Sequence, residues 1–253
     1  MQRPQKLTVP IEAYHDAMAS TAPNAGAASG PSAPPDAVTA PKEGRRERKK
    51  RETRTRISDI ATGLFMARGF DAVTVAEIAE AADVSVNTVY NYFPAKEDLF
   101  FDREEEMVER TSALVRDRAP GQSAAAAVLG RLREDIGERN LYAGIKEGFG
   151  DFMRVVRESP ALVARLMMLH HRTADRLRQT LADETGAGPG DPMPELVAYE
   201  LVNLVDLVTR RATLSVADGV SPEQTARDAL ARLDAYESLV TGALLNYATK
   251  PAR

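Results

Sequence analysis

A row of polar side chains between residues 84 and 100 is well suited to contacts at a surface. In VSVNTVYNYFPAKEDLF the row consists of amide, hydroxyl and phenol groups, which belong to Asn87, Thr88, Asn91 and Tyr92. At about 100° per residue, these groups point away from the face formed by Val89, Tyr90 and Phe93. Amides and hydroxyls can pair with base edges and phosphate oxygens, so the row predicts contact with nucleic acid.

Two short helices are predicted to position this row. Thr74, with Glu77 three residues on, is a capping box that begins the first. Asp83-Val84 makes a turn, and Ser85 caps a second helix over Val86–Tyr92. A short helix, a tight turn and a second short helix are typical of a helix-turn-helix, whose second helix enters the major groove. A polar surface helix of an ordinary helical bundle is the alternative interpretation.

A longer helix, predicted over Glu47–Arg68, precedes these two. Its apolar stripe recurs at helical spacing: Ile57, Ile60, Ala61, Leu64 and Phe65. It begins in the basic run Arg45–Arg56, where eight cationic residues and two glutamates give a net +6. The whole chain carries −4, so the remainder carries −10. A concentrated basic segment in an acidic chain favours a nucleic-acid partner.

Composition excludes several classes of site. The 253 residues contain no Cys and three His, so thiol catalysis, disulfides and thiolate zinc sites are ruled out. His170 and His171 are not spaced as metal ligands, and no catalytic constellation is present, so we expect no metal, no cofactor and no enzyme. No apolar run approaches the ~20 residues of a membrane span, which favours a cytoplasmic protein.

Element patterns predict an all-α chain in three parts. Residues 1–44 are Ala/Pro-rich and predicted to be a disordered tail, residues 45–100 a three-helix helix-turn-helix domain, and residues 101–249 a helical bundle. Six helices are expected from the end of the first domain onward, over 95–118, 122–137, 141–157, 160–185, 195–217 and 222–248.

Two features of the bundle leave alternatives open. The last two helices are the most apolar; they either complete the core of one subunit or form a dimer seam through residues such as Leu204 and Leu233. Gly144, Gly148 and Gly150 lie within the third predicted bundle helix. Since glycine costs about 1 kcal/mol in a helix, they indicate either a close helix contact or space for a ligand.

Residues 54–100 resemble the DNA-binding domain of the TetR/AcrR family of bacterial repressors. The likeness lies in Ala-x-x-Leu-Phe at 61–65, Gly69-Phe70, the Thr74 cap, Val84-Ser85 and Tyr90-x-Tyr92-Phe93-Pro94-x-Lys96. Asp83 departs from the Gly that many relatives have in the turn, but Asp tolerates a left-handed conformation.

The resemblance implies roles for individual residues. Thr74 would bind a backbone phosphate, and Asn87, Thr88 and Asn91 would face the groove. Phosphates on either side would be held by Tyr90, Tyr92 and Lys96. The helical wheel turns the Tyr90 ring and Val86 toward the core, whereas the family often places the residue at the Val86 position near DNA.

The resemblance also implies a dimer with an effector pocket in the second domain, and the candidate pocket residues are Phe149, Phe152, Met153, Met167, His170 and His171. The function it implies is a homodimeric, ligand-responsive transcription regulator, a repressor released from a palindromic double-stranded DNA operator by a small hydrophobic effector. The alternative is an architectural or adaptor-type DNA-binding helical protein with no small-molecule effector.

Overall fold

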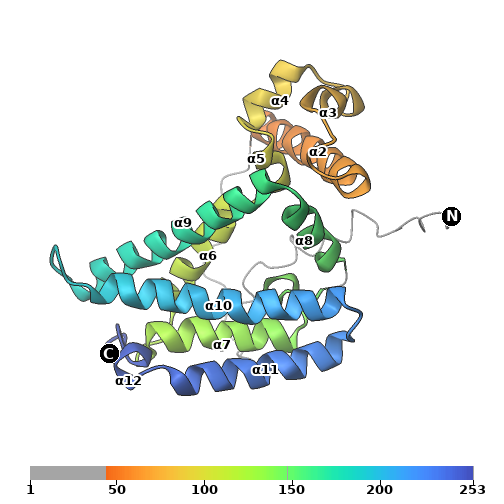
Figure 1. Cartoon of the computed structure of the whole chain (residues 1–253). Coiled ribbons are helices and arrows are strands. Elements are labelled where there is room, and N and C mark those ends of the chain that lie inside the picture. The colour runs from red at the N-terminus through yellow and green to blue at the C-terminus, as the bar shows by residue number, and fades with distance from the viewer. Residues whose placement is uncertain (1–43, 147, 253) are drawn as a thin grey trace, which may run out of the picture. The chain divides into compact units, whose positions relative to one another are not determined.

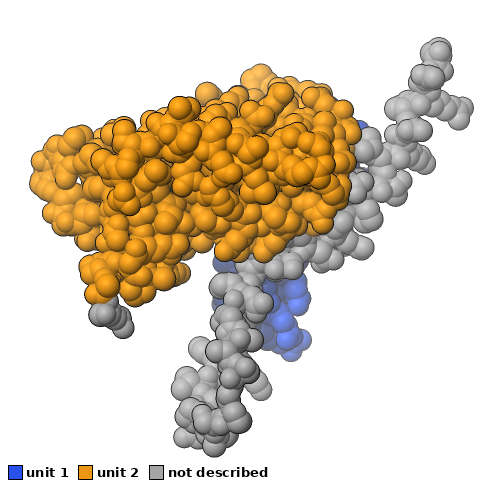
Figure 2. Space-filling view, turned by 90° about the horizontal axis from the view of Figure 1, so that it is seen from below, with its two compact units in different colours: residues 1–100 blue, residues 101–253 orange. Residues whose placement is uncertain are grey.

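The computed structural model describes residues 44–146 and 148–252, and the chain divides into two compact units, residues 1–100 and 101–253 (Figure 2). Within these ranges the regular structure is helical throughout and contains no strand (Figure 1). The predicted all-α class is therefore confirmed. The tail predicted over residues 1–44 lies, except for Gly44, outside the described residues.

The first unit is built on one long helix. It contains α2 (Arg45–Arg68), α3 (Val75–Ala81), α4 (Val86–Tyr92) and α5 (Glu97–Phe100), and α3 and α5 pack on α2. The predicted stripe of α2 supplies much of the core, with Ile57, Ala61 and Phe65 fully buried. The Phe65 ring lies 4.9 Å from that of Phe70 and 5.9 Å from that of Phe100, centre to centre, so aromatic contacts join α2 to the elements around it.

The turn between α3 and α4 has the geometry that its sequence predicts. Asp83 adopts a left-handed conformation with φ +52°, and the Val84 N–H donates to the Ala79 carbonyl at 3.0 Å. Ser85 then caps α4 by accepting the Thr88 N–H at 3.0 Å. The expectation that Asp83 can stand where relatives have Gly is confirmed.

The second unit is a helical bundle around α10 (Figure 1). Its helices are α6 (Glu104–Asp117), α7 (Ala124–Gly137), the 3₁₀ turn η1 (Leu141–Ala143), α8 (Phe149–Glu158), α9 (Pro160–Thr185), α10 (Met193–Ala217), α11 (Pro222–Leu239) and α12 (Gly242–Leu245). α10 packs against α7, α8, α9 and α11, and its residues Val197, Leu201 and Val208 are fully buried.

Three of the predicted bundle helices are broken. The helix expected over 95–118 stops at Phe100 and restarts at Glu104, and the helix expected over 222–248 stops at Leu239 before α12. The helix expected over 141–157 is replaced by η1 and α8. Gly144 at φ +71° and Gly148 at φ +82° both leave the right-handed helical region, so no continuous helix can pass through them.

These glycines settle one of the open alternatives. A Cβ on Gly144 would lie 2.6 Å from the Thr209 carbonyl oxygen, and a Cβ on Gly150 would lie 2.9 Å from the Ala217 Cβ. Both neighbours belong to α10. Close contact with a helix, and not space for a ligand, therefore accounts for Gly144 and Gly150.

The two residues predicted to lie in a dimer seam are instead core residues of one subunit. Leu204 is 6% exposed and Leu233 is 0% exposed, and both belong to the cluster that α10 and α11 form with α7 and α9. Apolar side chains that remain exposed on these helices include Leu196, Leu207 and Leu239. Periodicity identified the two helices as apolar but could not separate the side chains facing the core from those facing outward.

Candidate nucleic-acid interface

The outward face of α4 carries the polar row. Val89 and Phe93 are buried beneath the helix, whereas Asn87 and Asn91 are exposed one turn apart. Tyr92 is half-buried at the end of the helix. Two amides on one side of a short, capped helix are the arrangement that can reach base edges in a groove.

Two residues of α4 do not lie where the helical wheel placed them. Tyr90 was predicted to turn its ring toward the core, but 48% of it is exposed. It follows Val89 by about 100° around the helix and therefore lies at the edge of the buried stripe. Val86 was also predicted to turn inward and is 38% exposed, because it is the first residue of α4 and no preceding turn covers it. Both side chains are therefore exposed at the edge of the buried stripe.

Thr74 begins α3 through a complete capping box. Its hydroxyl donates to Glu77 Oε2 at 2.8 Å and accepts the Glu77 N–H at 3.2 Å. The backbone N–H of Thr74 and the Arg68 guanidinium also donate to the Glu77 carboxylate. Together these hydrogen bonds lower the pKa of Glu77 to about 2. Thr74 is exposed, so a phosphate could reach it, but its hydroxyl proton already has an acceptor.

Thr88 and Lys96 also have internal partners. The Thr88 hydroxyl lies 2.8 Å from the Ser85 hydroxyl, which draws it toward the cap of α4. The Lys96 ammonium donates to the Phe70 carbonyl at 2.6 Å and lies 4.2 Å from the centre of the Phe70 ring. Burial lowers the pKa of Lys96. The lysine predicted to contact phosphate therefore ties α5 to the loop after α2.

The basic run is the first half of α2. Arg45, Arg46 and Lys49 are exposed, and Arg48 pairs with Glu52 at 3.6 Å. Arg54 differs from these residues, because its guanidinium donates to the Tyr92 carbonyl at 2.8 Å and lies 4.3 Å from the centre of the Phe93 ring. Sequence reasoning missed this role, although Arg54 precedes the buried Ile57 and Ser58 by three and four residues on the same face of α2.

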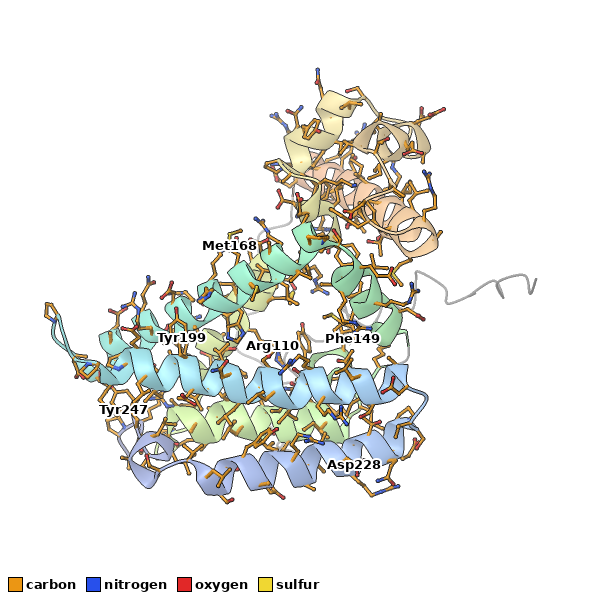
Figure 3. All side chains as sticks on the ribbon, in the orientation of Figure 1. Arg110, Phe149, Met168, Tyr199, Asp228 and Tyr247 are labelled. Atoms are coloured by element: carbon orange, nitrogen blue, oxygen red, sulfur yellow. The ribbon has the colours of Figure 1, made fainter. Side chains whose placement is uncertain are left out.

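The predicted effector residues do not form one lining. The Phe149 and Phe152 rings stack at 5.8 Å, and Phe152 meets Phe101 edge-on at 6.4 Å. Met167 is 65% exposed, so it cannot line an enclosed pocket. Of the remaining candidates, Met153 and His170 are half-buried, and the exposed His171 lies 3.4 Å from the Tyr199 hydroxyl. Figure 3 shows Phe149 on α8, and Met168, next to Met167, on the outer side of α9.

A polar cluster that sequence reasoning missed lies beside α6. An open hollow of about 550 Å³ is lined by Glu105, Glu106, Glu109, Arg110 and Ala113. The guanidinium of Arg110, which is labelled in Figure 3, lies 3.8 Å from the centre of the Tyr142 ring and 2.6 Å from the buried carboxylate of Asp135. The guanidinium is therefore held between an aromatic face and a carboxylate, and three of the five residues that line the hollow are glutamates.

Ion pairs join α6 to α9. Glu104 binds Arg165 at 2.6 Å and also pairs with Arg172, while Glu109 pairs with Arg176 at 2.7 Å. The hydrogen bond from Arg176 lowers the pKa of Glu109. These contacts fix the register of α6 against α9 by charge, in addition to the apolar packing between the two helices.

Other kinds of site receive no support. Within residues 44–146 and 148–252 there is no group of three His, Asp or Glu side chains that could hold a metal ion. In the same ranges no helix is both long and apolar enough to cross a membrane.

A sequence profile described as "Bacterial regulatory proteins, tetR family" matches residues 57–102. The chain is 29% identical over 153 residues to the HTH-type transcriptional regulator TcmR of Streptomyces glaucescens, and the match covers 58% of this chain and 67% of TcmR. It is 40% identical over 70 residues to the HTH-type transcriptional repressor KstR of Mycolicibacterium smegmatis, covering 28% of this chain and 34% of KstR.

A solved structure shares the fold. It is that of NalD, the secondary repressor of the MexAB-OprM multidrug efflux pump in Pseudomonas aeruginosa. The likeness has a TM-score of 0.50 at 18% identity and covers 73% of this chain and 96% of NalD. At this level of identity the likeness supports the fold alone. The sequence matches to regulators agree with the expectation that the chain is not an enzyme.

Proposed function

We propose that this chain, a TetR-family DNA-binding transcriptional regulator by its sequence matches, is a homodimeric, cytoplasmic repressor released from a palindromic operator by a small hydrophobic effector. The observation that carries the proposal is the outward face of α4. Asn87 and Asn91 are exposed on a helix held by Val89, Phe93 and the Ser85 cap.

In this proposal the α4 face reads sequence and the start of α2 supplies affinity. An Asn amide can donate to and accept from one adenine edge at once, a pairing worth about 1–3 kcal/mol against the wrong base. Arg45, Arg46 and Lys49 are exposed cations that can hold phosphate without reading bases. Tyr90 and Tyr92 lie beside the amides, and their hydroxyls can donate hydrogen bonds to phosphate oxygens of the DNA backbone.

The experiment compares two kinds of variant on two duplexes. One duplex is enriched by the wild-type protein from a randomised library, and the other is its scrambled sequence. Asn91→Ala should weaken binding to the enriched duplex by about tenfold and leave the scrambled one unchanged. Replacing Arg45, Arg46 and Lys49 by Ala should weaken both and flatten the salt dependence by about 0.9 for each phosphate that these side chains bind. Asn203→Ala, an exposed Asn of α10, is the matched control.

Equal weakening of both duplexes by Asn91→Ala would mean that the α4 face holds phosphates, and the proposed role of the amides would be wrong. A wild-type protein that enriches no duplex from the library would contradict the proposal as a whole.

We place the dimer seam on the outward stripes of α10 and α11. Leu196 and Leu207 are eleven residues apart on α10, and Leu239 is 81% exposed at the end of α11. Ala231 and Ala235 are exposed on α11 at the same helical face as Leu239. Small residues next to exposed leucines allow two copies to approach closely, and a two-fold dimer suits a palindromic operator.

We place the effector beside α6 and α8. The stacked rings of Phe149 and Phe152 offer apolar surface, and Arg110 over Tyr142 offers a polar end. A ligand bound there would favour a different position of α6 relative to the arginines of α9 with which it pairs. Release from DNA then follows by population shift, toward dimers whose α4 helices no longer match half-sites about 34–36 Å apart.

The alternative is a DNA-binding helical protein without an effector. A thermal-shift screen of small hydrophobic compounds separates the two possibilities. A compound that raises the melting temperature and lowers affinity for the enriched duplex supports the repressor, and Phe152→Ala should abolish both effects. Failure of every compound to move either quantity would favour the alternative.

A further inference from the structure

We propose that Arg54, although it belongs to the basic run, does not bind DNA but positions the recognition helix α4 from behind. The inference rests on two contacts. The Arg54 guanidinium donates to the carbonyl of Tyr92, the last residue of α4, at 2.8 Å, and it lies 4.3 Å from the centre of the Phe93 ring.

The carbonyl that Arg54 caps needs an external donor. The last carbonyls of a helix have no partner within the helix. Tyr92 is followed by Phe93, whose N–H turns back to the Val89 carbonyl at 2.9 Å, and then by Pro94, which has no N–H. The N–H of Ala95 donates to Asp98 at 2.8 Å. The N–H groups of Phe93 and Ala95 are therefore committed elsewhere and Pro94 has none, and a cation suits the negative end of the helix dipole.

The second contact fixes the direction of the guanidinium. Phe93 is 1% exposed, so its ring is a rigid surface of the core. A planar guanidinium over an aromatic face keeps donors in its plane available, and one of them reaches Tyr92. Arg54 also lies three residues before the buried Ile57 on α2. The arginine thus connects the longest helix of the unit to the end of the helix that carries Asn91.

The consequence is a positioning role in specificity. α4 has seven residues, too few to be stable alone, so its direction depends on its caps and its packing. Ser85 holds its first turn and Arg54 its last. Removing the Arg54 guanidinium should loosen the last turn, where Asn91 and Tyr92 lie, and the cost should fall on sequence reading and not on general affinity for DNA.

The test has one arm without DNA and one with it. The variants are Arg54→Met, which keeps an apolar stem without donors, and Arg54→Lys, which keeps the charge without the planar fork. Arg56→Met, two residues on and exposed, is the matched control. Hydrogen exchange in the α4 amides should accelerate about tenfold in both Arg54 variants, relative to α2 and α3, and stay unchanged in Arg56→Met.

The DNA arm rests on the proposed function and uses the enriched and scrambled duplexes over a range of salt. Arg54→Met should weaken the enriched duplex by about tenfold, leave the scrambled duplex within about twofold, and leave the salt slope unchanged. A phosphate contact would instead weaken both duplexes and flatten the slope by about 0.9, which would overturn the inference. Restored affinity for the enriched duplex in Arg54→Lys would also overturn the inference.

The two arms fail separately. If the wild-type protein selects no duplex, the proposed function fails while hydrogen exchange still decides the role of Arg54. Unchanged α4 exchange in Arg54→Met would overturn the positioning role whatever the DNA results. Exchange that rises equally across α2, α3 and α4 would also overturn it, because Arg54 would then stabilise the unit without a particular effect on α4.

Discussion

Replacing Gly144 by Ala should destabilise the second unit strongly. Gly144 caps η1 at φ +71°, ψ +16°, a left-handed conformation that costs Ala about 1–2 kcal/mol. The added Cβ would lie 2.3 Å from the Thr213 hydroxyl oxygen and 2.6 Å from the Thr209 carbonyl oxygen. The hydroxyl can rotate away, at the cost of its 2.9 Å bond to that same carbonyl, but the backbone of α10 cannot.

The magnitude follows from these two contributions. Overpacking against a backbone costs about 1–3 kcal/mol, so the free energy of unfolding should fall by about 2–5 kcal/mol in total. For a chain of this size the melting temperature should drop by about 5–15 °C. Gly130→Ala is the control, because Gly130 lies within α7 and its added Cβ meets nothing within 4 Å. That variant should gain about 0.5–1 kcal/mol, the opposite sign.

The assay is urea denaturation followed by circular dichroism, with calorimetry for the melting temperature. Equal stability of Gly144→Ala and the wild type would refute the close contact between the η1 turn and α10. It would return the glycine to the other interpretation, that it leaves space for a ligand, and effector binding would then change in the variant while folding did not.

Two further predictions concern the dimer and the response to pH. Leu239→Arg should dissociate the dimer in light scattering without loss of helix, because this side chain is exposed in one subunit. Leu233→Arg should instead unfold the bundle, because it buries a charge. A Leu239→Arg protein that remains dimeric would mean that the seam lies elsewhere. The pKa of Glu77 is lowered to about 2 by the capping box and Arg68, so its contribution is complete above pH ~4.5 and is lost as pH falls from there toward 2. The stability difference between wild type and Glu77→Gln, measured in urea at pH 6 and pH 3, should therefore shrink at the lower pH, and a constant difference would contradict the assignment.

Capping residues and helical periodicity made the helices of the first unit predictable from the sequence. The Thr74–Glu77 box, the Ser85 cap and the left-handed Asp83 are interactions within three or four residues, so their types and spacing suffice to predict them. The same local logic predicted α4 over Val86–Tyr92, with its two amides outward. The glycines at 144 and 148 were recognised as costly within the helix predicted over 141–157, but the break that their left-handed conformation makes was not predicted.

Only tertiary structure could decide which partner each charged or apolar side chain finds. Arg54 and Tyr92 are 38 residues apart, and Lys96 and Phe70 are 26 apart, so two cations in a predicted DNA-binding region have internal acceptors. Leu233 and Leu239 lie on one apolar helix, yet one is fully buried and the other 81% exposed. The physical reason is that period and composition give a helix its apolar face, whereas burial and hydrogen-bond partners depend on which distant helices pack against that face.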